Sequence, residues 1–306
     1  MKSKKGFKLS KNHRNKVFLL FLSVIFATLI VLFFQTKTWT KENIANLEVK
    51  DTAPPTKSEE IDTKNLDLLG KAELSFAGGT DGRNKNIEIG IEKINGTVIK
   101  PGEEFSFHKA IGKVIPEDGW SVEKIFLNGE VKKGLGGGLC QLSSLMFQTA
   151  LKSGLPVTER QNHSYTVSYY DVGLDATYSD PGPNLKFRND TKHPISIKGS
   201  VEGLTAKFEI YGKSDGRVAS TSEAEVIETV DFPPTRYFYV PELEEGQSEC
   251  VNTPQIGYTA KIKYGVMYPD GVYKEKDFVS KYKPLQRVCY IIGEKIKTFD
   301  ITKLSF

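Results

Sequence analysis

The sequence predicts an α+β fold that is preceded by a single N-terminal transmembrane helix. Three observations predict it: a charge-free run at residues 17–34, a glycine-rich loop that leads into one amphipathic helix, and short strand patterns on both sides of that helix. Strands around one helix are typical of domains in which the helix packs on antiparallel or mixed strands. A small all-β domain is expected to follow.

Residues 17–34, VFLLFLSVIFATLIVLFF, carry no charge. As a helix at 1.5 Å per residue they would reach about 27 Å, enough to cross a bilayer core. Residues 1–16 hold seven Lys or Arg and no acid, which predicts a cytoplasmic N-terminus. No small-x-small cleavage site follows, so a retained anchor is favoured over a cleaved signal. We therefore expect a single-pass protein of the cell membrane with an extracytoplasmic body.

The charge balance limits the possible partners of that body. The formal net charge of +4 comes from the basic tail, because the chain after residue 16 holds more acidic than basic residues. A body without excess positive charge is not expected to bind nucleic acid. His and Cys are too scattered for paired zinc ligands, so neither a metal nor another cofactor is predicted.

Composition divides the exterior chain into two domains and two linkers. Residues 35–67 are polar and contain Pro54-Pro55, which predicts a linker. Residues 68–213 are expected to form the α+β domain, and residues 214–225 a second linker. Residues 226–293 are rich in turn signals such as Pro269-Asp270-Gly271, so an all-β domain is predicted there, with a tail at residues 294–306.

The central helix is predicted from apolar residues that share one stripe: Leu142, Leu145, Met146 and Ala150. Gly154 is expected to end it. Cys140 would then lie in the first turn, where free backbone N–H groups and the helix dipole favour a thiolate. The alternative is a small buried cysteine with no chemical role.

The glycines before this helix have a second predicted role. Gly136, Gly137 and Gly138 let a ligand approach the backbone closely and expose N–H groups that can hold a developing oxyanion. A phosphate-binding loop is the other interpretation of such a sequence, but the Lys-Ser/Thr pair of that motif is missing.

A cysteine nucleophile needs a base, and the chain has four histidines. His13 falls in the predicted cytoplasmic tail, while His108 and His193 have the character of surface and turn residues. His163 is the predicted base, because it follows the helix by one short turn. It is expected to begin a strand within residues 158–170, on which His163, Tyr165, Val167 and Tyr169 share one face.

Three further polar positions are candidates around this pair. Asp175 is the predicted carboxylate that orients His163, ahead of Asp171 and Asp180. Arg160 is expected either to bind a substrate carboxylate or to form an exposed salt bridge. A serine nucleophile at Ser143 or Ser144 is the competing chemistry, but the SxxK pattern of β-lactam-binding enzymes is absent.

The chain after the apolar run contains three cysteines. Cys250 and Cys289 both fall in strand-like segments of the last domain and are predicted to form a disulfide, which an exported chain can make. That pairing would leave Cys140 as the free thiol. The alternative is that all three are reduced.

Five segments resemble the VanW domain family: INGTVIKPGEEFSF, GGGLCQLSS, GLPVTERQNHS, VSYYDVGLDAT and LKFRN. The resemblance covers roughly residues 68–213. The closing domain resembles a degenerate G5 domain, a cell-surface module. His108 and Asn184 depart from the family pattern, which more often has Asn after FSF and an Asp before the L-x-F strand.

The resemblance implies a cysteine-dependent L,D-transpeptidase of cell-wall peptidoglycan. Cys140 would attack the carbonyl of the third residue of a tetrapeptide stem, terminal D-alanine would leave, and the thioester would pass to an amine of another stem as a 3-3 cross-link. His163 matches the family's ERxxHS histidine and Asp175 its G-x-DAT aspartate. The surrounding positions would bind the substrate: Gly136, Gly137, Gly138, Gln141, Ser143, Ser144 and Arg160.

Two alternatives stay open. One is a non-catalytic protein that binds peptidoglycan or assists glycopeptide resistance, with Cys140 in a structural role. The other is a cysteine amidase or peptidase, which would use the same residues and take water in place of the amine.

Overall fold

The computed structural model describes residues 63–127, 130–239, 248–251 and 253–291. The chain divides into two compact units, residues 1–53 and 54–306, and every described residue belongs to the second. The predicted cytoplasmic tail, the predicted anchor, most of the first linker and the C-terminal tail lie outside the described residues. The predicted boundaries of the domains stay predictions.

The prediction of a single-pass anchor, and with it the predicted location in the cell membrane, is corrected by the structure. Segment 17–34 lies outside the described residues. Within the described ranges no helix combines the length and the apolar character that crossing a bilayer requires. The helices α2 (Asp81–Ile94) and α4 (Leu139–Lys152) have 14 residues each, whereas a spanning helix needs about 20.

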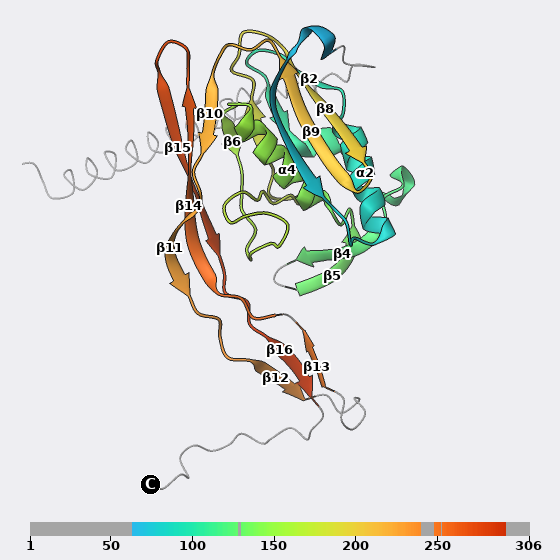
Figure 1. The fold of residues 1–306 in the computed structure, drawn as a ribbon. Coiled ribbons are helices and arrows are strands. Elements are labelled where there is room, and N and C mark those ends of the chain that lie inside the picture. Colours follow the sequence, from blue (N-terminus) through green and yellow to red (C-terminus); the bar gives the residue numbers. More distant parts are fainter. Residues whose placement is uncertain (1–62, 128–129, 240–247, 252, 292–306) are drawn as a thin grey trace, which may run out of the picture. The chain divides into compact units, whose positions relative to one another are not determined.

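The predicted α+β class is also wrong, because the described chain is mostly β-sheet with few helices (Figure 1). Besides α2 and α4, the described residues contain the short helix α3 (Phe107–Ile111) and two 3-10 turns, η1 (Thr63–Asn65) and η2 (Pro116–Asp118). Among the described residues the helices are few and short, and after residue 213 they are followed by strands alone, β10 to β16. The described chain therefore contains more strands than helices.

The largest sheet of the first part carries the helices. Its antiparallel order is β1 (Asp67–Ser75), β9 (Thr205–Gly212), β8 (Ile195–Glu202) and β2 (Thr97–Ile99). Burial alternates along β9, so that Phe208 and Ile210 are fully buried. Helix α4 packs on β1 and β9, and α2 on β8. The predicted apolar stripe of α4 belongs to this core, since Leu142 and Leu145 are fully buried.

Two smaller sheets contain the strands that precede and follow α4 along the chain. The hairpin of β4 (Val122–Leu127) and β5 (Glu130–Leu135) leads directly into the glycine loop. The other sheet has the order β3 (Glu104–Ser106), β7 (Lys186–Arg188) and β6 (Val157–Glu159), and β6 follows α4 along the chain. Both sheets are antiparallel.

The remaining described residues form two further sheets. In one, β10 (Val218–Thr221) and β11 (Glu225–Val230) flank β14 (Gly257–Met267), which also pairs with β15 (Tyr273–Tyr282). In the other, β16 (Val288–Ile291) lies between β12 (Arg236–Tyr239) and β13 (Ser248–Val251). Cys250 and Cys289 face each other across β13 and β16 and are joined by a disulfide.

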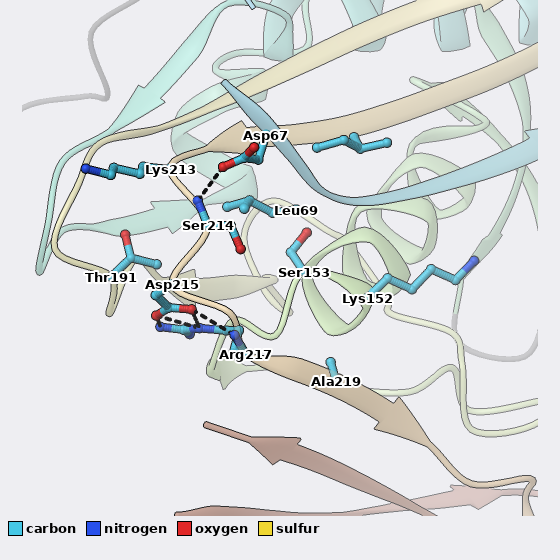
Figure 2. Close-up of a pocket in the computed structure, with 11 residues that line it drawn as sticks. Asp67, Leu69, Lys152, Ser153, Thr191, Lys213, Ser214, Asp215, Arg217 and Ala219 are labelled. Carbon is cyan, nitrogen blue, oxygen red and sulfur yellow. Dashed lines mark hydrogen bonds and ion pairs between the residues drawn. The ribbon is translucent and has the colours of Figure 1, made fainter. Parts of the chain in front are cut away.

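A cavity of about 280 Å³ lies at the C-terminal end of α4, where Lys152 and Ser153 line it together with Asp67 and Arg217 (Figure 2). Arg217 forms an ion pair with Asp215 at 2.6 Å and donates to the carbonyl of Gly154 at 2.9 Å. These contacts tie the end of α4 to the segment before β10. Because Cys140 begins the same helix, this cavity is at the far end of α4 from the thiol.

The core around α4 makes a prediction about stability. Replacing the fully buried Leu142 by alanine removes apolar contacts and leaves a cavity, which lowers the free energy of unfolding by about 2–5 kcal/mol. The same change at Leu204, which is 47% exposed, should cost less than about 0.5 kcal/mol. Urea unfolding of both variants measures the difference, and equal losses would contradict this placement of the core.

Candidate active site

Cys140 is the second residue of α4, so its predicted place in the first turn of a helix is confirmed. Of the described cysteines it is the one that is not in a disulfide, and its side chain is partly exposed. The thiol donates to the carbonyl of Tyr178 at 3.3 Å, and the backbone N–H of Tyr178 donates to the sulfur at 3.5 Å. The sulfur is thereby held between the helix and the segment around residue 178.

The three glycines before α4 are buried by packing. A Cβ atom at Gly137 would lie 2.6 Å from Cβ of Glu123, and one at Gly138 would lie 3.0 Å from Cγ1 of Ile87. Gly138 has φ +115°, a conformation that favours glycine. The amide of Asn86 also donates to the carbonyl of Gly137 at 3.1 Å. Close approach to β4 and α2 therefore explains these glycines, and their predicted oxyanion role stays a prediction.

Asp175 is the centre of the hydrogen-bond network beside the thiol, and its side chain is only 1% exposed. Its Oδ2 accepts from the backbone N–H and from Nδ1 of His163, both at 2.6 Å. Its Oδ1 accepts from Nη2 of Arg160 at 3.1 Å and from the hydroxyl of Tyr282 at 2.5 Å. The structure thus brings His163 and Asp175 together, as the sequence predicted.

The pKa of His163 is raised above its ordinary value in this setting. Burial lowers the pKa of His163, but hydrogen bonds to Asp175 and Cys140, together with the charges of these two groups, raise it to about 9. Burial raises the pKa of Asp175, and the neighbouring His163 and Arg160 lower it below its usual value. Because Nδ1 is bound to Asp175, Nε2 is the nitrogen left for the thiol. The hydroxyl of Tyr169 lies 3.2 Å from Nε2.

Arg160 is buried, with a side chain only 3% exposed, so it does not form the exposed salt bridge that was one of its expected roles. It donates from Nε to the carbonyl of Asp175 at 2.7 Å, from Nη2 to that of Gly173 at 3.1 Å, and from Nη1 to the hydroxyl of Ser280 at 2.8 Å. Its donors are therefore directed to the protein. We describe it as a residue that positions Asp175.

The predicted strand over residues 158–170 is wrong after Glu159, where β6 ends. The chain that follows is irregular because its polar groups bond outside any ladder with β6. Asn162 donates to the carbonyl of Lys281, and the carbonyl of Ser164 accepts from the N–H of Lys283. Of the face predicted from alternation, His163 and Tyr169 do meet, through the hydroxyl and the ring nitrogen.

Sequence reasoning missed the contribution of β15 to the site. The hydroxyl of Tyr282 donates to Asp175 and accepts from the N–H of Gly173 at 2.9 Å, and Ser280 binds Arg160. Both residues fall in the predicted C-terminal domain, more than 100 positions after Asp175. No local sequence pattern indicates a contact between residues so far apart in the chain.

The polar residues after Cys140 are structural in this geometry. Ser144 donates to the carbonyl of Cys140 at 2.8 Å and accepts from the N–H of Ala176 at 2.9 Å, which fixes the segment after Asp175 to α4. Ser143 and Ser144 are both fully buried, so neither is placed as a nucleophile. Gln141 is also buried and accepts from Nε of Arg83 at 2.8 Å.

The other candidate residues lie apart from the network. The ring of His108 contacts the carbonyl of Pro183 at 2.9 Å, and Asn184 accepts from the backbone N–H of His108. His193, Asp171 and Asp180 are exposed. Across the described ranges no group of three or more His, Cys, Asp or Glu residues is placed to hold a metal ion.

The hydroxyl of Tyr282 allows a test of whether β15 supports the site. Replacing Tyr282 by phenylalanine removes one donor from buried Asp175 and one acceptor from Gly173. We expect the free energy of unfolding to fall by about 1–3 kcal/mol. Tyr273→Phe is the matched control on the same strand, since Tyr273 is 51% exposed, and it should change stability by less than about 0.5 kcal/mol. Equal effects in thermal unfolding would show that β15 does not support the site.

Comparison with known proteins is consistent with this geometry. A family model described as VanW like protein matches residues 82–211. The chain is 32% identical over 158 residues to "Uncharacterized protein YoaR" of Bacillus subtilis (strain 168), covering 52% of each protein. It is 33% identical over 111 residues to "Vancomycin B-type resistance protein VanW" of Enterococcus faecalis (strain ATCC 700802 / V583), covering 35% of this chain and 40% of that protein. The chain thus spans about half or less of the length of these relatives. Residues 82–211, which contain Cys140, His163 and Asp175, are thus similar to the VanW family, and part of the chain is homologous to both relatives.

Proposed function

We propose that this protein acts on the bacterial cell wall as a cysteine L,D-transpeptidase, in a role associated with vancomycin resistance. The link to resistance follows the name of the Enterococcus relative. The observation that carries the chemistry is Cys140 in the first turn of α4 beside a His163 that Asp175 holds through two hydrogen bonds. A nucleophile, a base and a group that orients the base are what acyl transfer through cysteine needs.

In the proposed reactive form the proton is on His163 and the sulfur is a thiolate, which no longer makes the hydrogen bond that the thiol donates to the carbonyl of Tyr178. The pKa of His163, raised to about 9, supports placing the proton on the ring. A thiolate is the nucleophilic form of cysteine. Asp175, buried and ionised, stabilises the imidazolium and fixes the ring so that Nε2 is left for the sulfur.

The proposed reaction has two halves. The Cys140 thiolate attacks the carbonyl carbon of the third stem residue, and the C–N bond to terminal D-alanine breaks as His163 gives its proton to the leaving amine. An amine of a second stem then attacks the thioester, His163 takes the proton from that amine, and the thiolate leaves. The backbone N–H of Cys140 is the proposed donor to the oxyanion, because the N–H groups of Leu139, Gln141 and Leu142 donate to the carbonyls of Gly136 and Gly138.

The alternatives differ from this proposal in defined ways. A non-catalytic binding protein would not need an Asp175-held His163 beside a partly exposed thiol. A cysteine hydrolase would use every residue of the site and differ only in its acceptor. The decisive experiment must therefore identify the acceptor as well as the nucleophile.

We expect the full-length protein, incubated with a disaccharide-tetrapeptide, to gain a thioester adduct on Cys140 and to yield a cross-linked dimer that lacks one D-alanine. Intact-protein and product mass spectrometry measure both. Cys140→Ala should show neither, because the nucleophile is gone, while His193→Gln, which alters an exposed histidine, should behave as the native protein.

Two other outcomes decide between the alternatives. An adduct that releases only free tripeptide would assign the protein as a hydrolase. No adduct and unchanged substrate, from a folded protein whose Cys140 thiol still reacts with iodoacetamide, would exclude catalysis on this donor.

A further inference from the structure

We propose that Arg83 selects the acyl donor by binding the free terminal carboxylate of the stem peptide, the group that departs with the leaving amino acid. This inference rests on the proposed acyl transfer at Cys140 and names the residue that recognises the substrate. It moves the predicted carboxylate-binding role from Arg160, whose donors are directed to the protein, to a cation on a different helix.

The position of Arg83 is fixed at the N-terminal end of α2. Its backbone N–H donates to the hydroxyl of Thr80, which caps that helix. Its side chain passes over Gly138, where an added Cβ would lie 3.5 Å from Cγ of Arg83. Its Nε then donates to the side chain of Gln141 at 2.8 Å. Since Gln141 follows Cys140 directly, this contact tethers the guanidinium beside the nucleophile.

The charges of Arg83 and Cys140 both affect the pKa of Tyr169. Burial and the charges of Cys140 and Asp175 raise the pKa of the Tyr169 phenol, and the charge of Arg83 opposes that rise. The hydroxyl of Tyr169 contacts Nε2 of His163. Arg83, Cys140 and His163 therefore act on one tyrosine, which places the cation of α2 close to the reacting sulfur.

Arg83 differs from Arg160 in the hydrogen-bond donors that it has left for a ligand. Arg83 is partly exposed, and in the part of the chain that the structure describes it has no ion pair with Asp or Glu. With Nε bound to Gln141, its two terminal nitrogens present the planar fork that binds a carboxylate in bidentate geometry. A cation beside the nucleophile that lacks an acidic partner suits an anionic substrate.

The substrate class follows from this arrangement. In a tetrapeptide stem the terminal carboxylate belongs to the residue just beyond the bond that breaks, so it lies close to the attacking sulfur. A stem that ends in an amide has no such charge, and a longer stem carries it one residue farther away. Arg83 should therefore favour donors with a free carboxylate one residue beyond the scissile bond.

The first test measures carboxylate binding with a small reagent in place of a peptide. Full-length protein is alkylated at Cys140 with iodoacetate, which carries a carboxylate, and with iodoacetamide, which is neutral and of similar size. In Arg83→Gln the rate with iodoacetate should fall about tenfold relative to iodoacetamide, because the charge-assisted contact is lost. Lys85→Gln removes an exposed charge from the same helix and should leave the ratio unchanged, while Arg83→Lys should restore part of it.

The second test compares a tetrapeptide donor with its C-terminal amide by the rate of acylation of Cys140. The native protein should prefer the free acid, and Arg83→Gln should lose that preference. An unchanged iodoacetate ratio in Arg83→Gln, or equal use of acid and amide by the native protein, would overturn the role of Arg83. A changed ratio with no acylation by either donor would uphold carboxylate binding and overturn the proposed transpeptidase.

Discussion

The buried carboxylate of Asp175 is the constraint on which the rest of the site depends. A carboxylate with 1% exposure is costly unless donors surround it. Asp175 is satisfied by the ring and the backbone of His163, by Arg160 and by Tyr282. These donors come from the segment after β6 and from β15. The Asp175 side chain therefore connects distant parts of the chain next to the start of α4.

Through this arrangement the β-rich C-terminal part contributes residues to the candidate site. Tyr282 and Ser280 on β15 complete the partners of Asp175 and Arg160, and the same strand accepts hydrogen bonds from the irregular segment that carries His163. The thiol is held from the other side by Tyr178, while Ser144 fixes the intervening segment to α4. The position of the imidazole is thus determined by packing over a large part of the described chain.

Local sequence patterns predicted the elements that depend on residues close together in the chain. The apolar stripe and the glycine stop are enough to define α4 and to place Cys140 in its first turn, and the short turn after α4 was enough to choose His163 among four histidines. The strand predicted around His163 failed because polar groups after Glu159 bond outside a ladder, and because Tyr169 and Tyr170 contact His163 and the carbonyl of Gln141. The α+β class failed because strand content accumulates in the C-terminal part. The burial of Arg160 and the contacts of Tyr282 and Arg83 depend on residues distant in sequence, which periodicity does not reveal.

The central claim is that Asp175 and Cys140 together hold a protonated His163 beside the sulfur. It is tested most directly by an NMR titration of the His163 ring in the full-length protein and in Cys140→Ala. The account predicts that native His163 keeps its proton at neutral pH and titrates at about pH 9. Its pKa should be lower in Cys140→Ala, because the hydrogen bond and the charge that raise it are removed. Titration near the ordinary value of 6.5 in both proteins would contradict the account.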